Sequence, residues 1–171
     1  MSRLIQRTST LIVANTAVWF SCSAAFAEED GHHLPHNHIA VVVGRAYERA
    51  SDGHEEEGNL LGVDWEYQFD ERWGVGIVFE QEAFGGNTKA NRHSILAVPV
   101  SYHLNDRWRV FGAVGMEFRD LGDPDEPLIR LGTGYNFHIG KHFTIAPELM
   151  FDFISGGDKV YVFGLAFGYG F

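Results

Sequence analysis

The chain has 171 residues, 45% of them hydrophobic, and its 13 basic and 23 acidic side chains give a formal net charge of −10 at pH 7. This length fits one domain, and the acidic balance argues against nucleic acid as a partner. The single cysteine, Cys22, belongs to the leader described next, so the rest of the chain lacks thiols for disulfides or cysteine catalysis.

The first residues have the pattern of a secretory signal peptide. Arg3 and Arg7, with no acid beside them, precede an apolar run at 11–20, and the small residues Ala25 and Ala27 stand just before an acidic stretch. The apolar run is much shorter than the roughly twenty residues that a membrane-spanning helix needs. We therefore expect residues 1–27 to be a signal peptide and exclude them from the fold.

The next segment, residues 28–37, is rich in histidine. Because imidazole is a good ligand for zinc, copper and nickel, the sequence predicts a transition-metal site here. Its ligands would be His32, His33, His36 and His38. The spacing matches no closed metal site, so the alternative is a polar tail with no metal and no cofactor.

From residue 38 onward the apolar residues follow a period of two, which predicts β-strands rather than helices. In the last segment one face carries Tyr161, Phe163, Leu165, Phe167, Tyr169 and Phe171, and the other face carries small residues. The pattern predicts eight strands, at 38–48, 60–69, 73–82, 93–104, 108–118, 128–139, 143–153 and 160–171.

The predicted connections alternate between short and long. The short turns are at 70–72, 105–107 and 140–142, and the longer loops are at 49–59, 83–92, 119–127 and 154–159. After the leader there is no apolar run of helix-spanning length, so any membrane span must consist of strands. We expect an all-β fold over residues 38–171: an eight-stranded antiparallel up-and-down transmembrane β-barrel with its short turns and both termini in the periplasm.

Aromatic residues flank each short turn. Tyr67 leads to Trp73, Tyr102 leads to Trp108, and Tyr135 leads to Phe143. Tyrosine and tryptophan prefer the level of lipid headgroups, so this repeat predicts an aromatic girdle at the periplasmic interface. The alternative is ordinary hairpin aromatics in a soluble sheet.

The apolar and polar faces of the predicted strands are reversed relative to those of a soluble barrel. A lipocalin places large apolar residues inside, whereas here the face opposite the large apolar residues combines glycine with charge. That face carries Asp64, Glu66, Gly74, Gly76, Glu80, Arg109, Glu117, Arg130, Gly132, Gly134, Glu148 and Asp152. A lipid-facing wall tolerates very little charge, so these residues should line the lumen. Glu117, Arg130 and Asp152 are predicted to lie at similar heights and to form a plugging salt-bridge cluster.

Three residues fit the simple alternation poorly. Pro99 and Pro147 fall within predicted strands. Proline has no N–H to donate, and a closed barrel has no edge strand where that lack would be harmless. We expect a bulge or a local distortion at each. Arg45 would face lipid, and it is expected above the apolar band or after a bulge.

The chain ends Phe167-Gly168-Tyr169-Gly170-Phe171. With this ending and the predicted architecture, residues 38–171 resemble the small outer-membrane β-barrel proteins, the group that includes the transmembrane domain of OmpA and the OmpX-like porin-family proteins. The resemblance implies location in the cell outer membrane, with contact to lipid and lipopolysaccharide. It also implies that the barrel-assembly machinery recognises Phe171.

Members of this group serve as adhesins, anchors, small channels or enzymes. We expect a structural or surface-interaction role without a wide pore, because an eight-stranded lumen is just wide enough for side chains to fill. The acidic stretches at 52–57 and 120–126 are expected to be solvated loops, the alternative being divalent-cation binding near lipopolysaccharide. Alternative functions are a small porin-like channel or metal binding through the histidine segment.

No enzymatic activity is expected. His93 and Ser94 lie near the outer rim, where an enzyme acting on lipid would need a nucleophile and a base. Adjacent strand residues point to opposite faces, so these two side chains should not pair.

Overall fold

The computed structural model describes residues 36–84, 91–119 and 124–171. The expected signal peptide at 1–27 and the histidines His32 and His33 lie outside these residues. Over the described ranges no helix has the length and apolar character needed to cross a membrane.

The described residues form nine strand segments. They are β1 (Asn37–Arg49), β2 (Glu55–Gln68), β3 (Trp73–Phe84), β4 (Asn91–His103), β5 (Trp108–Arg119), β6 (Glu126–Tyr135), β7 (Phe137–Ile139), β8 (Phe143–Ile154) and β9 (Lys159–Gly170).

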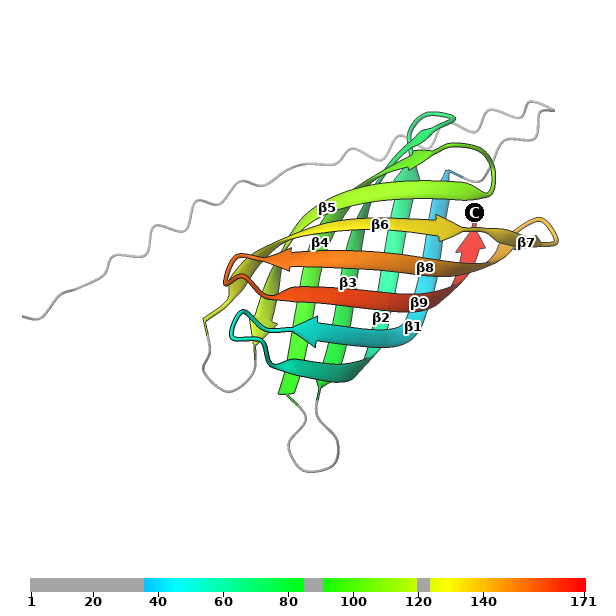
Figure 1. Ribbon diagram of the computed structural model, residues 1–171. Coiled ribbons are helices and arrows are strands. Elements are labelled where there is room, and N and C mark those ends of the chain that lie inside the picture. Colours follow the sequence, from blue (N-terminus) through cyan, green and yellow to red (C-terminus); the bar gives the residue numbers. More distant parts are fainter. Residues whose placement is uncertain (1–35, 85–90, 120–123) are drawn as a thin grey trace, which may run out of the picture. The chain divides into compact units, whose positions relative to one another are not determined.

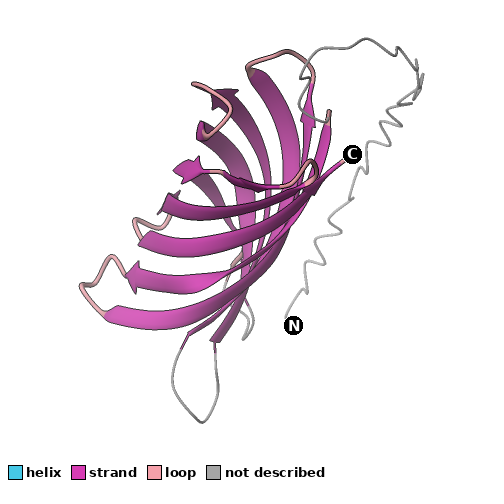
Figure 2. Ribbon diagram, turned by 90° about the vertical axis from the view of Figure 1, so that its right-hand side faces the viewer, coloured by secondary structure: helices cyan, strands magenta, loops and turns pink. Residues whose placement is uncertain are grey.

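The strands close into a barrel because β1 pairs antiparallel with both β2 and β9 (Figures 1 and 2). Sequence neighbours pair in order around the wall, and both β6 and β7 pair with β8. These two short strands therefore make up one span, the sixth, which the sequence predicted as a continuous strand at 128–139. The fold is a closed eight-stranded antiparallel up-and-down β-barrel, as predicted.

The register gives the stagger of the barrel. The stagger can be traced from Asn37 on β1, going from each residue to its paired residue on the next strand. After one circuit of the barrel this path returns to β1 at Tyr47 instead of Asn37. A closed sheet with such a displacement has strands tilted by about 35–45° from the barrel axis. Side chains from strands far apart in the sheet consequently meet across the lumen at positions that sequence spacing does not indicate.

Each proline interrupts one ladder without shifting its register. Opposite Pro99 the β3–β4 ladder lacks the pairs at Gly76 and Ile77, and it resumes in the same register. Opposite Pro147 the sixth span breaks between β6 and β7, and both pieces keep one register with β8. Proline has no N–H to donate to the ladder. The expected distortions are therefore local interruptions, and neither is a bulge.

The loops opposite the short turns are shorter than predicted. β1 and β2 remain paired as far as Arg49 and Glu55, so most of the predicted loop at 49–59 is strand. Within the acidic stretch at 52–57, Glu55, Glu56 and Glu57 belong to β2. The apolar pattern stops where polar residues begin, but the backbone hydrogen bonds between the two strands continue. The predicted contrast between short turns and long loops is correspondingly smaller.

Two of these loops close in the same way. The amide of Gly53 donates to the carbonyl of Ala50, and the amide of Gly157 donates to that of Ile154, each at 2.9 Å. Gly53 and Gly157 have φ angles of 90° and 96°, a region that favours glycine. Glycine at these two positions thus permits the tight return of the chain.

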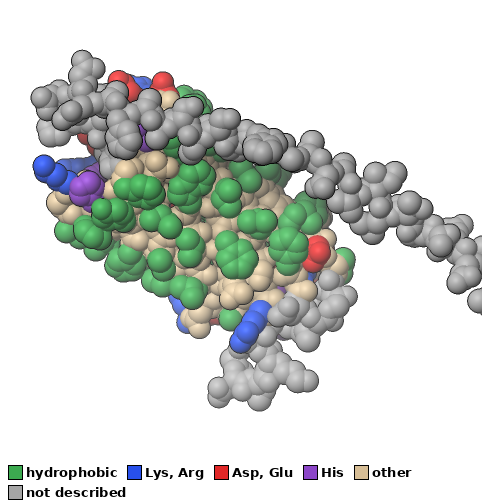
Figure 3. Space-filling view, turned by 180° about the vertical axis from the view of Figure 1, so that it is seen from behind, with side chains coloured by type: hydrophobic (Ala, Val, Ile, Leu, Met, Phe, Trp, Pro, Cys, Tyr) green, Lys and Arg blue, Asp and Glu red, His purple; other side chains and the backbone are tan. Residues whose placement is uncertain are grey.

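Large apolar side chains cover the outside of the barrel, as the alternation predicted. Valine, leucine, isoleucine and aromatic side chains of every full-length span point outward, and they form a broad belt in Figure 3. Arg45 also points outward, with Nη2 2.9 Å from Glu57 Oε2 and Nη1 3.0 Å from Asn59 Oδ1. The β1–β2 register is continuous here, so Arg45 is not at a bulge. It lies past Val43 and Leu61 but before the outward-facing Tyr47, near the edge of the apolar belt.

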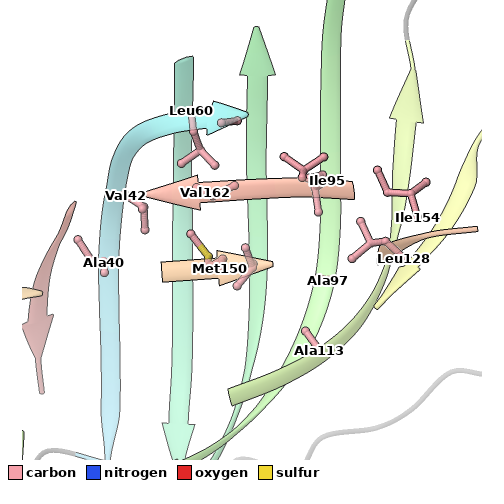
Figure 4. Packing of buried hydrophobic residues seen from close by; sticks show 14 of the residues in the cluster. Ala40, Val42, Leu60, Ile95, Ala97, Ala113, Leu128, Met150, Ile154 and Val162 are labelled. Carbon is pink, nitrogen blue, oxygen red and sulfur yellow. The ribbon is translucent and has the colours of Figure 1, made fainter. Parts of the chain in front are cut away.

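The inside of the barrel contains small and aliphatic residues as well as charges. The apolar part is the cluster of Ala40, Val42, Ala46, Leu60, Val78, Phe84, Ile95, Ala97, Ala113, Leu128, Ala146, Met150, Ile154, Val160, Val162 and Ala166. Figure 4 shows side chains of this cluster pointing inward from strands on several sides. They pack around the charged groups and leave little open lumen.

Candidate functional site in the barrel lumen

Three arginines organise the polar part of the lumen. Arg109 and Arg119 lie at the two ends of β5, and Arg130 lies on β6. Each alternates with outward-facing residues, so the strand period directs all three inward. Each contacts carboxylates from other strands, and the three groups are called the Arg109, Arg130 and Arg119 clusters below.

The Arg130 cluster crosses the middle of the barrel. The guanidinium is 1% exposed and forms two hydrogen bonds with Asp152 on β8, Nε to Oδ1 and Nη2 to Oδ2, both at 2.7 Å. Its Nη1 lies 2.5 Å from Oε2 of Glu80 on β3. In the strand order, β3 and β8 lie on opposite walls of the barrel. A buried charge is tolerable only when it is paired, and this arginine is paired on both walls.

The Arg109 cluster lies toward the end of the barrel that carries the short turns. Arg109 Nη1 is 2.7 Å from Glu66 Oε2, and Nη2 is 2.5 Å from Glu148 Oε1. Glu66 also accepts a hydrogen bond at 2.7 Å from Nε2 of the buried His103. The face of the Phe111 ring lies 5.1 Å from the guanidinium carbon, close enough for a cation–π contact.

The Arg119 cluster lies at the opposite end. Arg119 Nη2 is 3.1 Å from Glu117 Oε2 and 3.0 Å from Asp158 Oδ2. His93 Nδ1 is 2.5 Å from Glu117 Oε1. The prediction that Glu117 joins Arg130 is therefore wrong, although Arg130 does pair with Asp152. The β5–β6 register places Ala113, not Glu117, opposite Arg130.

Asp158 anchors two loops at this end. Its Oδ1 accepts a hydrogen bond at 2.7 Å from the backbone amide of Ser51, in the loop between β1 and β2. Burial opposes ionisation of this carboxyl, but the hydrogen bonds from Ser51 and Arg119 outweigh that effect and lower its pKa below the usual value. The charged form of Asp158 therefore holds the loop at 50–54 against the β8–β9 loop.

The space left between the clusters is small. A cavity of about 10 Å³ lies between Arg109 and Arg130, enough for a single water molecule. A larger cavity of about 70 Å³ opens at the short-turn end. Its lining includes His36, His38, Glu66, Gln68, His103, Asp106, Arg109, Asn136, His138, Lys141, His142 and Thr144.

The predicted metal ligands are only partly described. His36 Nδ1 lies 3.0 Å from the carbonyl oxygen of Gln68, and His38 Nε2 lies 2.9 Å from Thr144 Oγ1. His138 lines the same mouth from β7 and is exposed. Among the residues that the structure describes, no three histidine, cysteine or acidic side chains are grouped closely enough to hold a metal ion. A site that includes His32 and His33 stays a prediction.

His93 and Ser94 point to opposite faces, as predicted. His93 is buried in the lumen against Glu117 and packs on Phe84 with ring centroids 5.0 Å apart. Ser94 lies on the outward face of β4 beside Phe118. This pair does not form a base–nucleophile arrangement.

The sequence pattern predicts the lumen face but not all of its charged residues. Arg119 and Asp158 fall in predicted loops, and the pattern does not single out Glu82 or Glu48, whose Oε1 lies 3.9 Å from Arg119 Nη2. Glu82 is completely buried, and neither carboxylate oxygen has a hydrogen-bond partner among the described residues. The available signal was the period of two, which continues past the apolar residues and directs Glu82 and Arg119 inward.

Comparisons with known proteins bear on this architecture. No family profile and no curated protein matches the sequence. The solved structure of Ail, the attachment invasion locus protein of Yersinia pestis, aligns with a TM-score of 0.61 over 81% of this chain and 100% of that one. This chain has the fold of the small outer-membrane β-barrels.

Two further barrels agree. Neisserial surface protein A aligns with a TM-score of 0.65, covering 81% of this chain and 99% of that one. The outer-membrane protein OprG from Pseudomonas aeruginosa aligns with a TM-score of 0.58, covering 81% and 97%. The identities are 16% for Ail, 8% for the neisserial protein and 15% for OprG, so the likeness is one of fold. It confirms the predicted resemblance at that level.

Proposed function

We propose that this chain is an outer-membrane β-barrel with a structural or surface-interaction role, and that its lumen does not conduct solutes. The observation that carries this proposal is the Arg130 cluster, which connects Asp152 and Glu80 on opposite walls. A solute moving along the axis would have to separate buried charge pairs, and removing one partner of such a pair is costly.

The other clusters support the same conclusion. Arg109 joins β5 to β2 and β8, and Arg119 joins β5 to the β8–β9 loop, so ion pairs cross the lumen at three levels. Aliphatic side chains such as Val42 and Met150 fill the spaces between them. We infer that an eight-stranded barrel packed in this way has no continuous aqueous path.

The outer wall supports the proposed location. A soluble protein rarely exposes an apolar patch larger than a few hundred Å², whereas here the outward residues of all eight spans are apolar along most of their length. Such a wall suits contact with lipid acyl chains and, at one rim, with lipopolysaccharide. The short turns and both chain ends would then face the periplasm.

Phe171 fits a role in assembly. Its backbone exchanges two hydrogen bonds with Asn37, at 2.9 and 3.1 Å, which extends the pairing of β9 with β1 by one residue. The side chain remains exposed on the outside of the barrel. We propose that the barrel-assembly machinery recognises it before the barrel closes.

Conductance across planar lipid bilayers tests the closed lumen. The refolded wild-type protein should give no large stable openings, matching a bilayer that received heat-unfolded protein. Stable large openings would instead support the alternative of a small porin-like channel. Location is tested separately by cell fractionation with boiled and unboiled gels. A soluble periplasmic protein without a heat-dependent shift would contradict the membrane assignment.

We also propose that the chain is not an enzyme and needs no cofactor. The support is the opposite orientation of His93 and Ser94, which separates the candidate base from the candidate nucleophile. Incubating the refolded barrel with lipopolysaccharide and phospholipid, followed by mass spectrometry of the lipids, checks this. Time-dependent deacylation or acylation above that of heat-unfolded protein would refute it.

A further inference from the structure

Two of the three short turns repeat the same four-residue arrangement at the rim of the barrel. Each has a capping Asp or Asn, then an acidic residue, an arginine and a tryptophan, with a tyrosine on the neighbouring strand. The first turn has Asp70, Glu71, Arg72 and Trp73 with Tyr102 on β4, and the second has Asn105, Asp106, Arg107 and Trp108 with Tyr135 on β6.

The second turn is held in a defined shape. Asn105 Oδ1 accepts hydrogen bonds from the amides of Arg107 at 2.9 Å and Trp108 at 2.8 Å. Trp108 and Tyr135 are cross-strand partners whose ring centroids lie 5.1 Å apart. Arg107 Nη1 donates to the Tyr135 hydroxyl at 3.3 Å, which holds the guanidinium beside this aromatic pair.

These side chains line a surface cavity of about 320 Å³ formed by Asn105, Asp106, Arg107, Trp108 and Tyr135. Pockets for small ligands begin at about 300 Å³. The lining combines an arginine and an acidic residue with the rings of Trp108 and Tyr135. A ligand with a polar head and apolar tails fits this combination.

The first turn shares the arginine–tyrosine and tryptophan–tyrosine contacts of the second. Asp70 Oδ1 accepts from the amide of Arg72 at 3.2 Å, and Arg72 Nη1 donates to the Tyr102 hydroxyl at 3.1 Å. The rings of Trp73 and Tyr102 have centroids 4.9 Å apart. The arrangement is therefore built twice from different strands, which a chance surface pairing does not explain.

The charges at each turn suit a zwitterion. A guanidinium has five N–H donors, and the structure shows a single one of them, on Nη1, engaged with tyrosine at each turn. The neighbouring acids Glu71 and Asp106 are exposed and form no ion pair with any described residue. A cation and a carboxylate side by side at the edge of the apolar belt match a lipid headgroup that carries a phosphate and a primary ammonium.

We propose that these two turns are binding sites for an aminophospholipid headgroup of the phosphatidylethanolamine type. Arg107 and Arg72 bind the phosphate, Asp106 and Glu71 accept hydrogen bonds from the ammonium, and the Trp–Tyr pairs contact the glycerol and the first acyl carbons. The inference rests on the proposed membrane location, because only then do the turns lie at headgroup level.

The third short turn provides an internal contrast. It contains Gly140, Lys141, His142 and Phe143 and has no acidic residue. His142 Nδ1 already contacts the carbonyl oxygen of Gly170 at 2.9 Å, and its ring stacks on Tyr169. This turn can attract a phosphate through Lys141 but has no carboxylate for an ammonium.

Native mass spectrometry of the refolded barrel in detergent tests the proposal. The probes are dioleoyl phosphatidylethanolamine, phosphatidylcholine and phosphatidylglycerol, each at matched concentration, with inorganic phosphate in a fourth arm. The wild type should bind two molecules of phosphatidylethanolamine about threefold more tightly than the other lipids, the size expected for exposed charge pairs. Phosphatidylcholine carries the same charges but has no N–H to donate.

Two double variants separate the roles. Glu71→Gln with Asp106→Asn should abolish the preference for phosphatidylethanolamine while keeping phosphatidylglycerol binding. Arg72→Gln with Arg107→Gln should weaken the binding of phosphatidylethanolamine and of phosphatidylglycerol about threefold. The control Lys141→Gln should leave phosphatidylethanolamine binding unchanged. Equal binding of all three lipids by the wild type, or a preference that survives loss of both acids, would overturn the proposal.

Two further measurements test the headgroup sites and the membrane location separately. Displacement of all three lipids to the same extent by millimolar inorganic phosphate would reduce the sites to simple anion sites and refute the headgroup assignment. The unboiled gel shift and insertion into vesicles, measured on every variant, report separately on the membrane location. A barrel that inserts but shows no lipid preference refutes this inference alone, whereas one that does not insert refutes the proposed function.

Discussion

Arg130 on β6 contacts Glu80 on β3, with Nη1 2.5 Å from Oε2. The two residues are 50 positions apart in the sequence, and the strands β4 and β5 lie between β3 and β6 in the sheet. The contact exists because the barrel closes and its stagger brings the two side chains to the same height. Asp152 takes the other side of the same guanidinium. The centre of the lumen is thus connected across its width by one side chain.

Replacing this arginine should destabilise the barrel strongly. Arg130→Met leaves Glu80 and Asp152 buried without their partner, and breaking a buried pair costs about 3–5 kcal/mol. Urea unfolding in lipid vesicles measures the change. The triple variant with Glu80→Gln and Asp152→Asn removes the stranded charges and should recover part of the loss. A single variant as stable as the wild type would show that the ion pairs do not hold the lumen.

A charge on the outer wall should be far more harmful than a polar atom inside. Leu165 points outward near the middle of β9, and Ala166 points into the lumen. Leu165→Arg should cost about 2–4 kcal/mol, the value for arginine at the bilayer midplane, and should lower the folding yield in vesicles. Ala166→Ser is the matched control and should fold nearly as well as the wild type. Equal yields would mean that the faces are assigned incorrectly.

Acid should weaken the loop contact made by Asp158. Because the pKa of this carboxyl is lowered in the folded protein, its stabilising effect is complete above the unfolded pKa of about 3.9 and is lost as the pH falls through the lower, folded value. Asp158→Asn should cost about 1 kcal/mol at pH 7 and almost nothing at strongly acid pH.

Urea unfolding in vesicles at pH 7 and at pH 2 measures this pH dependence. Asp125→Asn, in the loop between β5 and β6, is the control, because Asp125 is exposed and makes no hydrogen bond to any described residue. An Asp158→Asn variant that keeps the full acid sensitivity of the wild type would contradict the assigned role.

Metal binding by the histidine segment also stays a prediction with a direct test. Calorimetry with zinc and copper should show binding by the wild type and its loss when His32, His33, His36 and His38 are all replaced by alanine. The affinity for the metal should decrease when the pH is lowered below about 6.5, because imidazole must be neutral to bind a metal. His38→Ala alone controls for loss of the Thr144 contact. Identical binding by wild type and quadruple variant would reclassify the segment as a linker.

Some details could not be predicted because they depend on where backbones pair. The sequence places Pro147 in a strand, but only the pairing shows that it faces Tyr135 and divides the sixth span. The sequence also ends strands where apolar residues stop, whereas β1 and β2 continue as far as Arg49 and Glu55. Backbone hydrogen bonds do not require apolar side chains, so the apolar pattern underestimates strand length.

The sequence alone determined the strand period, the number of spans and the inverted faces. These follow from local geometry, since successive strand residues point to opposite sides and a lipid-facing surface excludes charge. Only the tertiary structure decided which charges meet. Arg130 pairs with Glu80 and Asp152 rather than with Glu117, and Arg119 takes Glu117 and Asp158. Ion-pair partners depend on the register and stagger of a closed barrel, which the complete set of strand pairings fixes together and no single segment encodes.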